Sequence, residues 1–289
     1  MILGVVAAQR LLATPAVALW TPLSMAAVPQ IYLDVEDSTL ADVSGSCSAI
    51  SNLGAMGANG DFAQPTAGLR PSILDAELNG KRVLSFDGIN DVLQGASAAQ
   101  KDLFRNSGAG WGFVVYKKRT ASTSGSTGRQ LFFCSTASSG TRLGALAHSS
   151  TSAQQNKPQL GARRLDADSF VTMTAANPVS GSYSMHLFRV DYTSRLGDIH
   201  VDGAVSVSNA TFVSAGSTSD TAAATAIFLG ASTAGGGAPT DMDFAALVMS
   251  KENPSQDDID KLFGWAAHKY GLTASLPGGH PYKSSPPTV

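Results

Sequence analysis

Short runs of β-branched and aromatic residues alternate with turn-forming residues along most of the chain. The run Gly112–Lys117 (GFVVYK) is a dense example, and Val205–Val213 alternates apolar and polar side chains. Alternation of this kind indicates a half-buried strand, and Gly, Asn or Asp between such runs indicates a turn. The same signals predict further strands within Ile31–Leu40 and at Arg82–Phe86, Val92–Gln94, Gln130–Cys134, Leu143–Ala147, Phe170–Thr174, Met185–Val190, Asp198–Val201, Ile227–Leu229 and Phe244–Met249.

The spacing of these strands predicts the fold class. About ten short strands with turns between most neighbours are typical of an all-β sandwich or jelly roll. Residues 44–71 are rich in Gly, Ser and Ala, and we expect an irregular excursion there.

One amphipathic helix is predicted over residues 254–272. Ser255 is a suitable N-cap, two aspartates follow in the first turn, and Gly271 is placed to take the left-handed cap. Trp265 lies beside the apolar stripe and is interpreted as a packing residue, with ligand stacking as the alternative. The stripe, which we expect to pack on a sheet, consists of Ile259, Leu262, Phe263, Ala266, Ala267 and Tyr270.

The composition supports the all-β prediction and argues against nucleic acid as a binding partner. Charged residues make up 15% of the 289 residues, and 29 glycines are present; helical proteins need more charge on their exposed faces. The net charge of −2 gives no field that would recruit nucleic acid. The clusters 117–119 (KKR) and 163–164 (RR) are interpreted as solvated strand ends, with a phosphate-binding patch as the alternative. Cys47 and Cys134 permit one bridge; two buried thiols are expected.

Residues 1–30 form an apolar N-terminal segment. Its run is too interrupted, by Gln9, Arg10 and Pro15, for a membrane span, and it has no basic stretch at its start. We therefore predict an assembly arm that docks on another protein. Its docking residues are predicted to be Leu3, Val6, Leu11, Leu12, Val17, Leu19 and Trp20.

Four segments resemble those of concanavalin-A-like, laminin-G-like jelly rolls. They are LNGKRVLSFDGINDVLQG (78–95), IHVDGAVS (199–206), the stretch 227–272 with its terminal HKYGL, and SLPGGHPYK (275–283). The subtype that ends in a helix is frequent in bacteriophage tail and virion proteins and in bacterial surface proteins. The resemblance implies a virion or surface module, and no reaction. The stretch 51–64 departs from the family pattern, so the resemblance assigns no ligand role to that loop.

Catalytic chemistry finds little support in the sequence. Glycosidases of this fold need two carboxylates beside the scissile bond, whereas Glu36, Glu77 and Glu252 are the only glutamates and lie at turns or strand ends. No G-x-S-x-G or HExxH motif is present, and His186 and His200 are interpreted as structural residues. We expect a protein that is not an enzyme.

We also expect no cofactor and no metal. A calcium ion held by Asp241 and Asp243, with Asp87 and Asp91, is the alternative to simple turn capping. Most aromatic residues lie where a core is expected. Tyr32, Tyr183 and Tyr192 remain as candidate glycan contacts.

Two hypotheses of function follow. The first is a structural protein of a bacteriophage virion, a capsid decoration or tail-fibre module made in the host cytoplasm, present in many copies and bound to capsid or tail proteins through residues 1–30. The second is a lectin-like module that binds a cell-surface glycan. Either would comprise the arm 1–30, a jelly roll 31–253, a closing helix 254–272 and an extended Pro-rich tail 273–289.

Overall fold

The computed structural model describes residues 17–120, 129–135, 141–148, 156–179, 181–222 and 225–289. In these residues the strands are β1 (Ile31–Asp34), β2 (Leu40–Val43), β3 (Ser46–Ile50), β4 (Phe62–Ala63), β5 (Ser72–Leu78), β6 (Lys81–Asp87), β7 (Leu93–Gly95), β8 (Ala109–Lys118), β9 (Arg129–Ser135), β10 (Thr141–His148), β11 (Gln159–Ala162), β12 (Val171–Thr174), β13 (Tyr183–Asp191), β14 (Leu196–Val201), β15 (Ala204–Asn209), β16 (Ile227–Leu229) and β17 (Asp241–Ser250). The helices are α1 (Ala98–Lys101) and α2 (Gln256–Tyr270), with 3-10 turns at Pro22–Ser24, Gly57–Gly60, Ala67–Leu69 and Thr273–Ser275.

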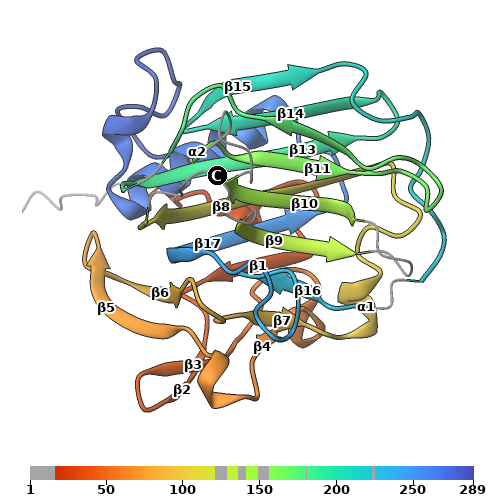
Figure 1. Cartoon of the computed structure of the whole chain (residues 1–289). Coiled ribbons are helices and arrows are strands. Elements are labelled where there is room, and N and C mark those ends of the chain that lie inside the picture. Colours follow the sequence, from red (N-terminus) through yellow and green to blue (C-terminus); the bar gives the residue numbers. More distant parts are fainter. Residues whose placement is uncertain (1–16, 121–128, 136–140, 149–155, 180, 223–224) are drawn as a thin grey trace, which may run out of the picture.

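All of these strands belong to one antiparallel sheet, which folds over into two layers (Figure 1). In the first layer β17 pairs with β8 on one side and with both β1 and β6 on the other, and β8 continues to β13, β14 and β15. In the second layer β7, β16, β9, β10, β11 and β12 pair in that order. Strand β3 joins the layers because it pairs with β4 and β5. The predicted all-β sandwich is confirmed.

The core lies between the layers. Phe86, Phe132, Phe188 and Phe244 are fully buried there and meet edge to face in pairs. This arrangement follows from the period of two along a strand, which sends alternate side chains of β8 and β13 into this core and out toward α2.

Helix α2 covers the outer face of the first layer. Ser255 accepts the N–H of Asp258, and Gly271 adopts φ 71°, as the caps predict. Leu262 and Phe263 are buried with Trp111 and Phe113 of β8. Trp265 is also buried, with its ring edge-on to Tyr32, which agrees with the packing interpretation.

Several sequence predictions need correction. Residues 44–71 contain β3 and β4, and β2, β5 and β11 were not predicted, because these short strands carry small or polar residues that alternate weakly. Strand β15 ends at Asn209, four residues earlier than expected; Phe212 and Val213 then turn into the core from a loop.

The described part of the N-terminal segment belongs partly to the sandwich. Trp20 and Met25 are buried in the core beneath α2, so Trp20 does not serve as a docking residue. Leu19 instead forms an isolated antiparallel bridge with Thr288, so the two chain ends lie side by side. No described helix has the length and apolar character needed to cross a membrane.

Candidate functional site

The structure buries two of the three candidate glycan contacts. Tyr32 is 2% exposed and its hydroxyl donates to Asp34 at 3.1 Å, while Tyr192 is fully buried. Tyr183 is half-buried, and the ammonium of Lys117 lies 4.8 Å from the centre of its ring. Tyr32 and Tyr192 therefore present no ring face to a sugar. Tyr32 of β1 packs edge-on to Trp265 of α2, and Tyr192 lies in the turn after β13 with its ring in the core between the layers. The sequence around each tyrosine does not reveal these contacts.

The predicted docking residues of the arm fall into two groups. Val17 and Leu19 are 67% and 62% exposed. Leu3, Val6, Leu11 and Leu12 lie outside the described residues.

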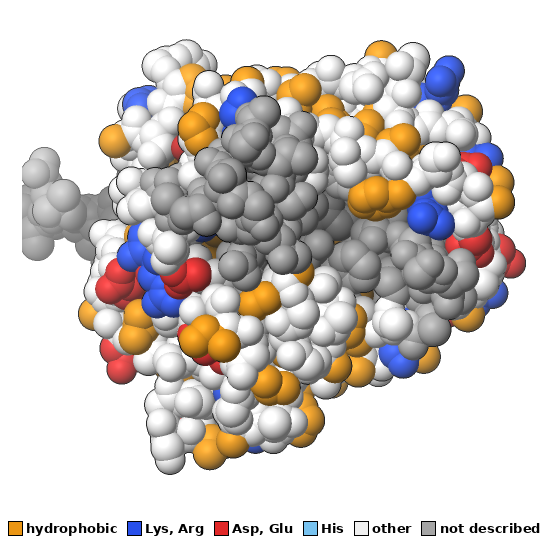
Figure 2. All heavy atoms as spheres, in the orientation of Figure 1, with side chains coloured by type: hydrophobic (Ala, Val, Ile, Leu, Met, Phe, Trp, Pro, Cys, Tyr) orange, Lys and Arg blue, Asp and Glu red, His pale blue; other side chains and the backbone are white. Residues whose placement is uncertain are grey.

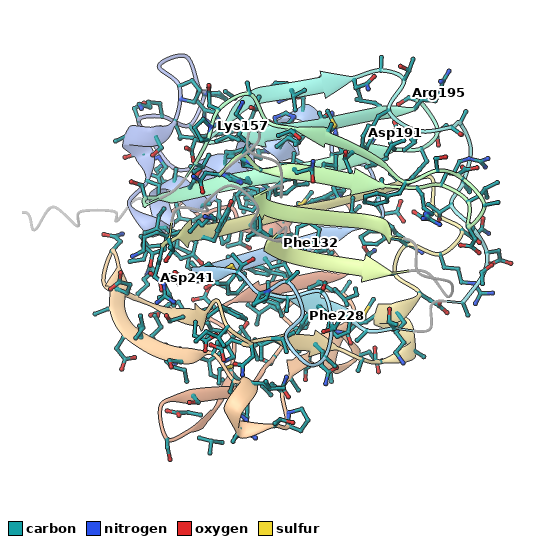
Figure 3. All side chains as sticks on the ribbon, viewed as in Figure 1. Phe132, Lys157, Asp191, Arg195, Phe228 and Asp241 are labelled. Carbon is teal, nitrogen blue, oxygen red and sulfur yellow. The ribbon has the colours of Figure 1, made fainter. Side chains whose placement is uncertain are left out.

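The basic cluster 117–119 forms an ion network rather than solvated strand ends. Lys117 contacts Asp243 at 2.8 Å and Glu77 at 2.9 Å, and Arg119 contacts Asp241 at 2.6 Å. The arginine thus occupies the place between Asp241 and Asp243 that the calcium alternative assigned to a cation. Figure 2 shows acidic and basic side chains gathered there, at the end of the sandwich where Figure 3 places Asp241. No group of three or more metal-ligating side chains occurs in the described residues.

His186 is a buried structural residue. Its Nδ1 lies 3.2 Å from the Tyr116 hydroxyl and its Nε2 lies 2.9 Å from the Ser184 hydroxyl. Burial lowers its pKa to about 3, so the ring is neutral at ordinary pH. Cys47 is a free, buried thiol.

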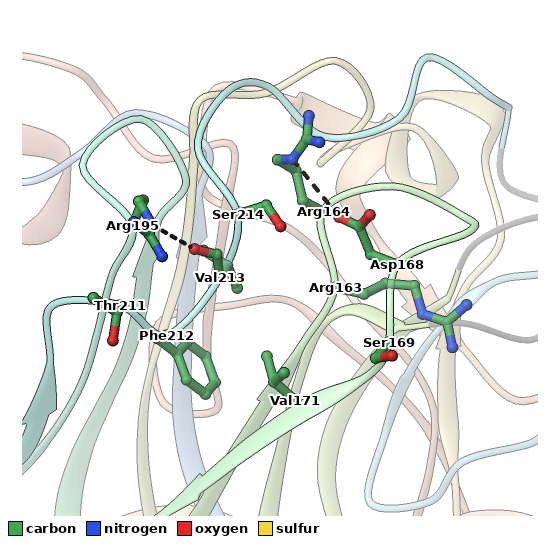
Figure 4. A pocket seen from close by; sticks show the side chains of 10 residues that line it. All are labelled: Arg163, Arg164, Asp168, Ser169, Val171, Arg195, Thr211, Phe212, Val213 and Ser214. Carbon is green, nitrogen blue, oxygen red and sulfur yellow. Dashed lines mark hydrogen bonds and ion pairs between the residues drawn. The ribbon is translucent and has the colours of Figure 1, made fainter.

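The candidate site is a pocket of about 340 Å³ at the opposite end of the sandwich (Figure 4). Figure 3 places Arg195 at that end, far from Asp241. Three segments build the pocket: the loop that follows β11, the turn between β13 and β14, and the loop that follows β15. The residues that line it are Arg163, Arg164, Asp168, Ser169, Val171, Arg195, Thr211, Phe212, Val213 and Ser214.

Arg195 forms one side of the pocket. Its backbone adopts φ 69°, in the left-handed region that side chains other than Gly, Asn and Asp rarely occupy. Its Nε donates to the Val213 carbonyl at 3.2 Å, and the Phe212 N–H donates to the Arg195 carbonyl at 2.9 Å. These two bonds hold the turn against the loop after β15. The Arg195 side chain is exposed, so its terminal guanidinium nitrogens lie on the solvent side.

Arg164 and Asp168 form the other side. The Arg164 Nε lies 3.7 Å from the Asp168 carboxylate, and the Leu165 N–H donates to the same carboxylate at 3.1 Å. Arg163 donates to the Asp166 carbonyl at 3.0 Å. The Nε atoms of Arg163 and Arg164 are buried without a hydrogen-bond partner among the described residues. A buried N–H without a hydrogen-bond partner costs free energy. Other contacts of the fold therefore hold the two arginines in this place.

Phe212 and Val171 form the floor between the two sides (Figure 4). Phe212 packs on Gly197 of β14, where a Cβ would meet the Phe212 ring at 2.3 Å. A glycine is therefore needed at 197 for the ring to lie flat on the strand. Ser169, Thr211 and Ser214 contribute hydroxyls to the rim.

The pocket has the chemistry of a site for a small anion-bearing ligand. Guanidinium groups bind carboxylates and phosphates through paired, charge-assisted hydrogen bonds, and three arginines and one carboxylate line this pocket. Its volume is at the low end of the range for ligand pockets, about 300–1,000 Å³. A second, polar cavity of about 360 Å³ lies beyond the same turn, lined by Asp191, Thr193 and Asn253 among others.

Sequence reasoning found part of this site and missed its centre. The two arginines at 163–164 are identified from the sequence as a basic cluster, with a phosphate-binding patch as the alternative to solvated strand ends. Arg195 and Phe212 carried no signal, because they lie in separate turns 31 and more residues away from the doublet.

Comparisons with known proteins give a likeness of fold. No protein-family model matches the chain, and no curated protein matches it. Trypanosoma rangeli sialidase in complex with sialic acid superposes with a TM-score of 0.52 at 12% identity, over 81% of this chain and 32% of the sialidase chain. The chain thus spans about a third of the sialidase. At this identity the likeness supports the β-sandwich fold alone.

Two other solved structures are similar at lower TM-scores. The binding domain of botulinum neurotoxin serotype G has a TM-score of 0.49 at 7% identity, over 81% of this chain and 50% of that domain. The CBM40 domain of Ruminococcus gnavus IT-sialidase, bound to α2,6-sialyllactose, has a TM-score of 0.43 at 12% identity, over 61% of this chain and 94% of that domain. Origin in a bacteriophage stays a prediction.

Proposed function

We propose that the chain is a carbohydrate-binding module, and that its arginine pocket binds a sugar carrying a carboxylate. The observation that carries the proposal is the placement of Arg164 and Arg195 on opposite sides of a small pocket with an apolar floor. A carboxylate between them gains charge-assisted hydrogen bonds. The apolar face of the sugar ring then packs on Phe212 and Val171, and its hydroxyls meet the serine and threonine side chains of the rim.

We propose binding without hydrolysis. A hydrolase of this type needs two carboxylates, one on each side of the scissile bond. Asp168 is the one carboxylate that lines the pocket, and it is engaged by Arg164 and by the Leu165 N–H.

The test measures binding of N-acetylneuraminic acid and of sialyllactose by calorimetry; the ligands named with the similar structures make these the first probes. Arg195→Gln is expected to weaken binding by about 10-fold or more, since a hydrogen bond to a charged group contributes about 1.5–3 kcal/mol. Arg82→Gln is the matched control, because Arg82 pairs with Glu36 outside the pocket. Lactose, which lacks the carboxylate, is expected to bind much more weakly than sialyllactose. Equal binding of the two sugars, or equal loss in both variants, would contradict the proposal.

We further propose that the module is displayed on a bacteriophage particle, as the family resemblance implies. The exposed Val17 and Leu19 at the described start of the chain support attachment through this end. Immunogold labelling of purified particles with an antibody against the jelly roll tests this placement. Labelled particles would support it, and unlabelled particles from producing cells would count against it.

A further inference from the structure

A third cavity, unrelated to the arginine pocket, lies where the two chain ends meet the C-terminal half of α2. It measures about 550 Å³, and its exposed wall is mostly apolar. We call it the terminal groove. Its lining residues are Leu19, Trp20, Thr21, Asp37, Asn79, Lys81, Trp265, His268, Lys269, Pro286 and Pro287.

Exposed apolar side chains concentrate at the chain ends, and one of them, Leu19, lines this groove. Of nine large hydrophobic side chains exposed in the described residues, five belong to the chain ends. Large apolar patches on a protein surface mark interaction sites. The five are Val17, Leu19, Leu23, Val28 and Val289.

One cation of the groove, Lys269, is neutralised by neighbouring carboxylates. Lys269 contacts Asp34 and Asp37, each at 2.6 Å, so its charge is paired at the groove wall. Its ammonium also lies 5.7 Å from the centre of the Trp265 ring. Trp20 and Trp265 are buried at the base of the groove. Asn79 and His268 of its wall have hydrogen-bond partners.

The course of the backbone indicates what reaches this groove. The Trp20 N–H donates to the Pro287 carbonyl at 3.0 Å, and the Val289 N–H donates to the Ala18 carbonyl at 3.1 Å. Leu19 and Pro287 line the groove, whereas Val17 and Val289 lie beyond it. Val17 and Ala18 are therefore directed out of the groove, along the C-terminal residues.

Residues 2–12 of the sequence supply an occupant of matching chemistry. They include Ile2, Leu3, Val5, Val6, Leu11 and Leu12, with Arg10 as the one charged side chain. Sixteen residues precede Val17, and sixteen extended residues span at most about 53–58 Å. That length reaches a neighbouring molecule. A return into the groove of the same molecule would need a reversal within residues 13–16.

We propose that the terminal groove is the receptor for the apolar arm, residues 2–12, of a second copy of this chain, so that copies associate by exchanging arms. The inference is independent of glycan binding. It assigns the exposed Leu19 a place at the interface, beside Pro286 and Pro287 of the groove wall.

The test compares full-length variants by sedimentation over a range of concentrations. Leu19→Glu places a charge in the groove, and Leu11→Asp with Leu12→Asp places charges in the arm. Each is expected to raise the dissociation constant of the oligomer by about 10-fold or more, since each replaces a leucine that the interface would bury with a charged residue. Val205→Glu is the matched control, because Val205 is 60% exposed on β15, outside the groove. Circular dichroism verifies that every variant folds.

Mixing decides whether the arm acts between copies. The groove variant retains its arm, and the arm variant retains its groove, so an equimolar mixture is expected to associate more strongly than either variant alone. A wild-type chain that is monomeric at all concentrations would overturn the proposal. So would an oligomer that Leu19→Glu leaves unchanged, or one that Val205→Glu weakens as much.

Discussion

Arg195 shows how one residue can combine local strain with a place in the candidate site. A left-handed backbone at a residue other than glycine costs on the order of 1–3 kcal/mol, and such residues cluster at functional sites. The bonds between Arg195 and the loop after β15 hold the turn in this conformation. Because the strained turn fixes the direction of the guanidinium, we interpret it as part of the ligand site.

His186 leads to a prediction about pH. With its folded pKa lowered to about 3 from 6.5, the unfolded state binds more protons between these values. The free energy of unfolding therefore falls as pH decreases below about 6.5, by up to ~1.4 kcal/mol per pH unit from this residue. Asp91, whose pKa is raised to about 6, acts in the opposite direction, since the folded state takes up its proton first as pH falls.

The contribution of His186 is isolated by comparing the wild type with His186→Gln. We expect the stability difference between them to shrink by about 1 kcal/mol from pH 6.5 to pH 5.5, in urea unfolding at each pH. Asp91→Asn provides a control whose difference from the wild type should move with the opposite sign. Parallel curves for wild type and His186→Gln would show that the ring titrates normally in the folded protein.

At the scale of the element, α2 depends on its buried face. Leu262 is fully buried between the helix and the sheet, so Leu262→Ala is expected to reduce the free energy of unfolding by about 2–5 kcal/mol. Gln256→Ala, at an exposed position of the same helix, is expected to change it by less than about 0.5 kcal/mol. Thermal and urea unfolding measure both. A loss below about 0.5 kcal/mol at Leu262 would mean that the stripe contributes little to the fold.

The loops at the two ends of the sandwich have different roles. At one end Arg119 and Lys117 pair with carboxylates of β5 and β17, and the network closes on itself. At the other end, hydrogen bonds to backbone carbonyls orient Arg163 and Arg195. Opposite charges at the first end neutralise each other, whereas three arginines and one carboxylate line the pocket at the second end.

At the scale of the whole molecule, the chain ends are part of the fold. Trp20 is 3% exposed and packs in the cluster beneath α2, and its N–H is bonded to Pro287. We expect Trp20→Ala to destabilise the domain by about 3–5 kcal/mol, the range for a large aromatic in a core.

The matched control for Trp20→Ala is Leu19→Ala, since the neighbouring side chain is 62% exposed. It is expected to leave the stability of the monomer within about 0.5 kcal/mol of the wild type. Differential scanning calorimetry under dilute conditions measures both. Equal melting temperatures for the wild type and Trp20→Ala would show that the N-terminal segment is separate from the core, as the sequence alone predicted.

The sequence alone was sufficient for features that depend on neighbours along the chain. The period-two pattern of Gly112–Lys117, the N-cap at Ser255 and the left-handed Gly271 all rest on local backbone physics, and the structure has each of them. The likeness of several ordered segments to jelly rolls also led to the right fold class. Local signals of this kind survive folding because the elements are built from contacts a few residues apart.

Tertiary structure alone decided which side chains meet and which are buried. The arginine pocket combines residues from 163 to 214, and its shape depends on long-range pairing of β11, β12, β14 and β15. Tyr32 is buried beneath α2, and Tyr192 is buried in the core between the layers. Trp20 is buried because the tail from 286 holds the N-terminal segment against α2. Burial and convergence depend on contacts between distant segments, and no local pattern in the sequence encodes those contacts.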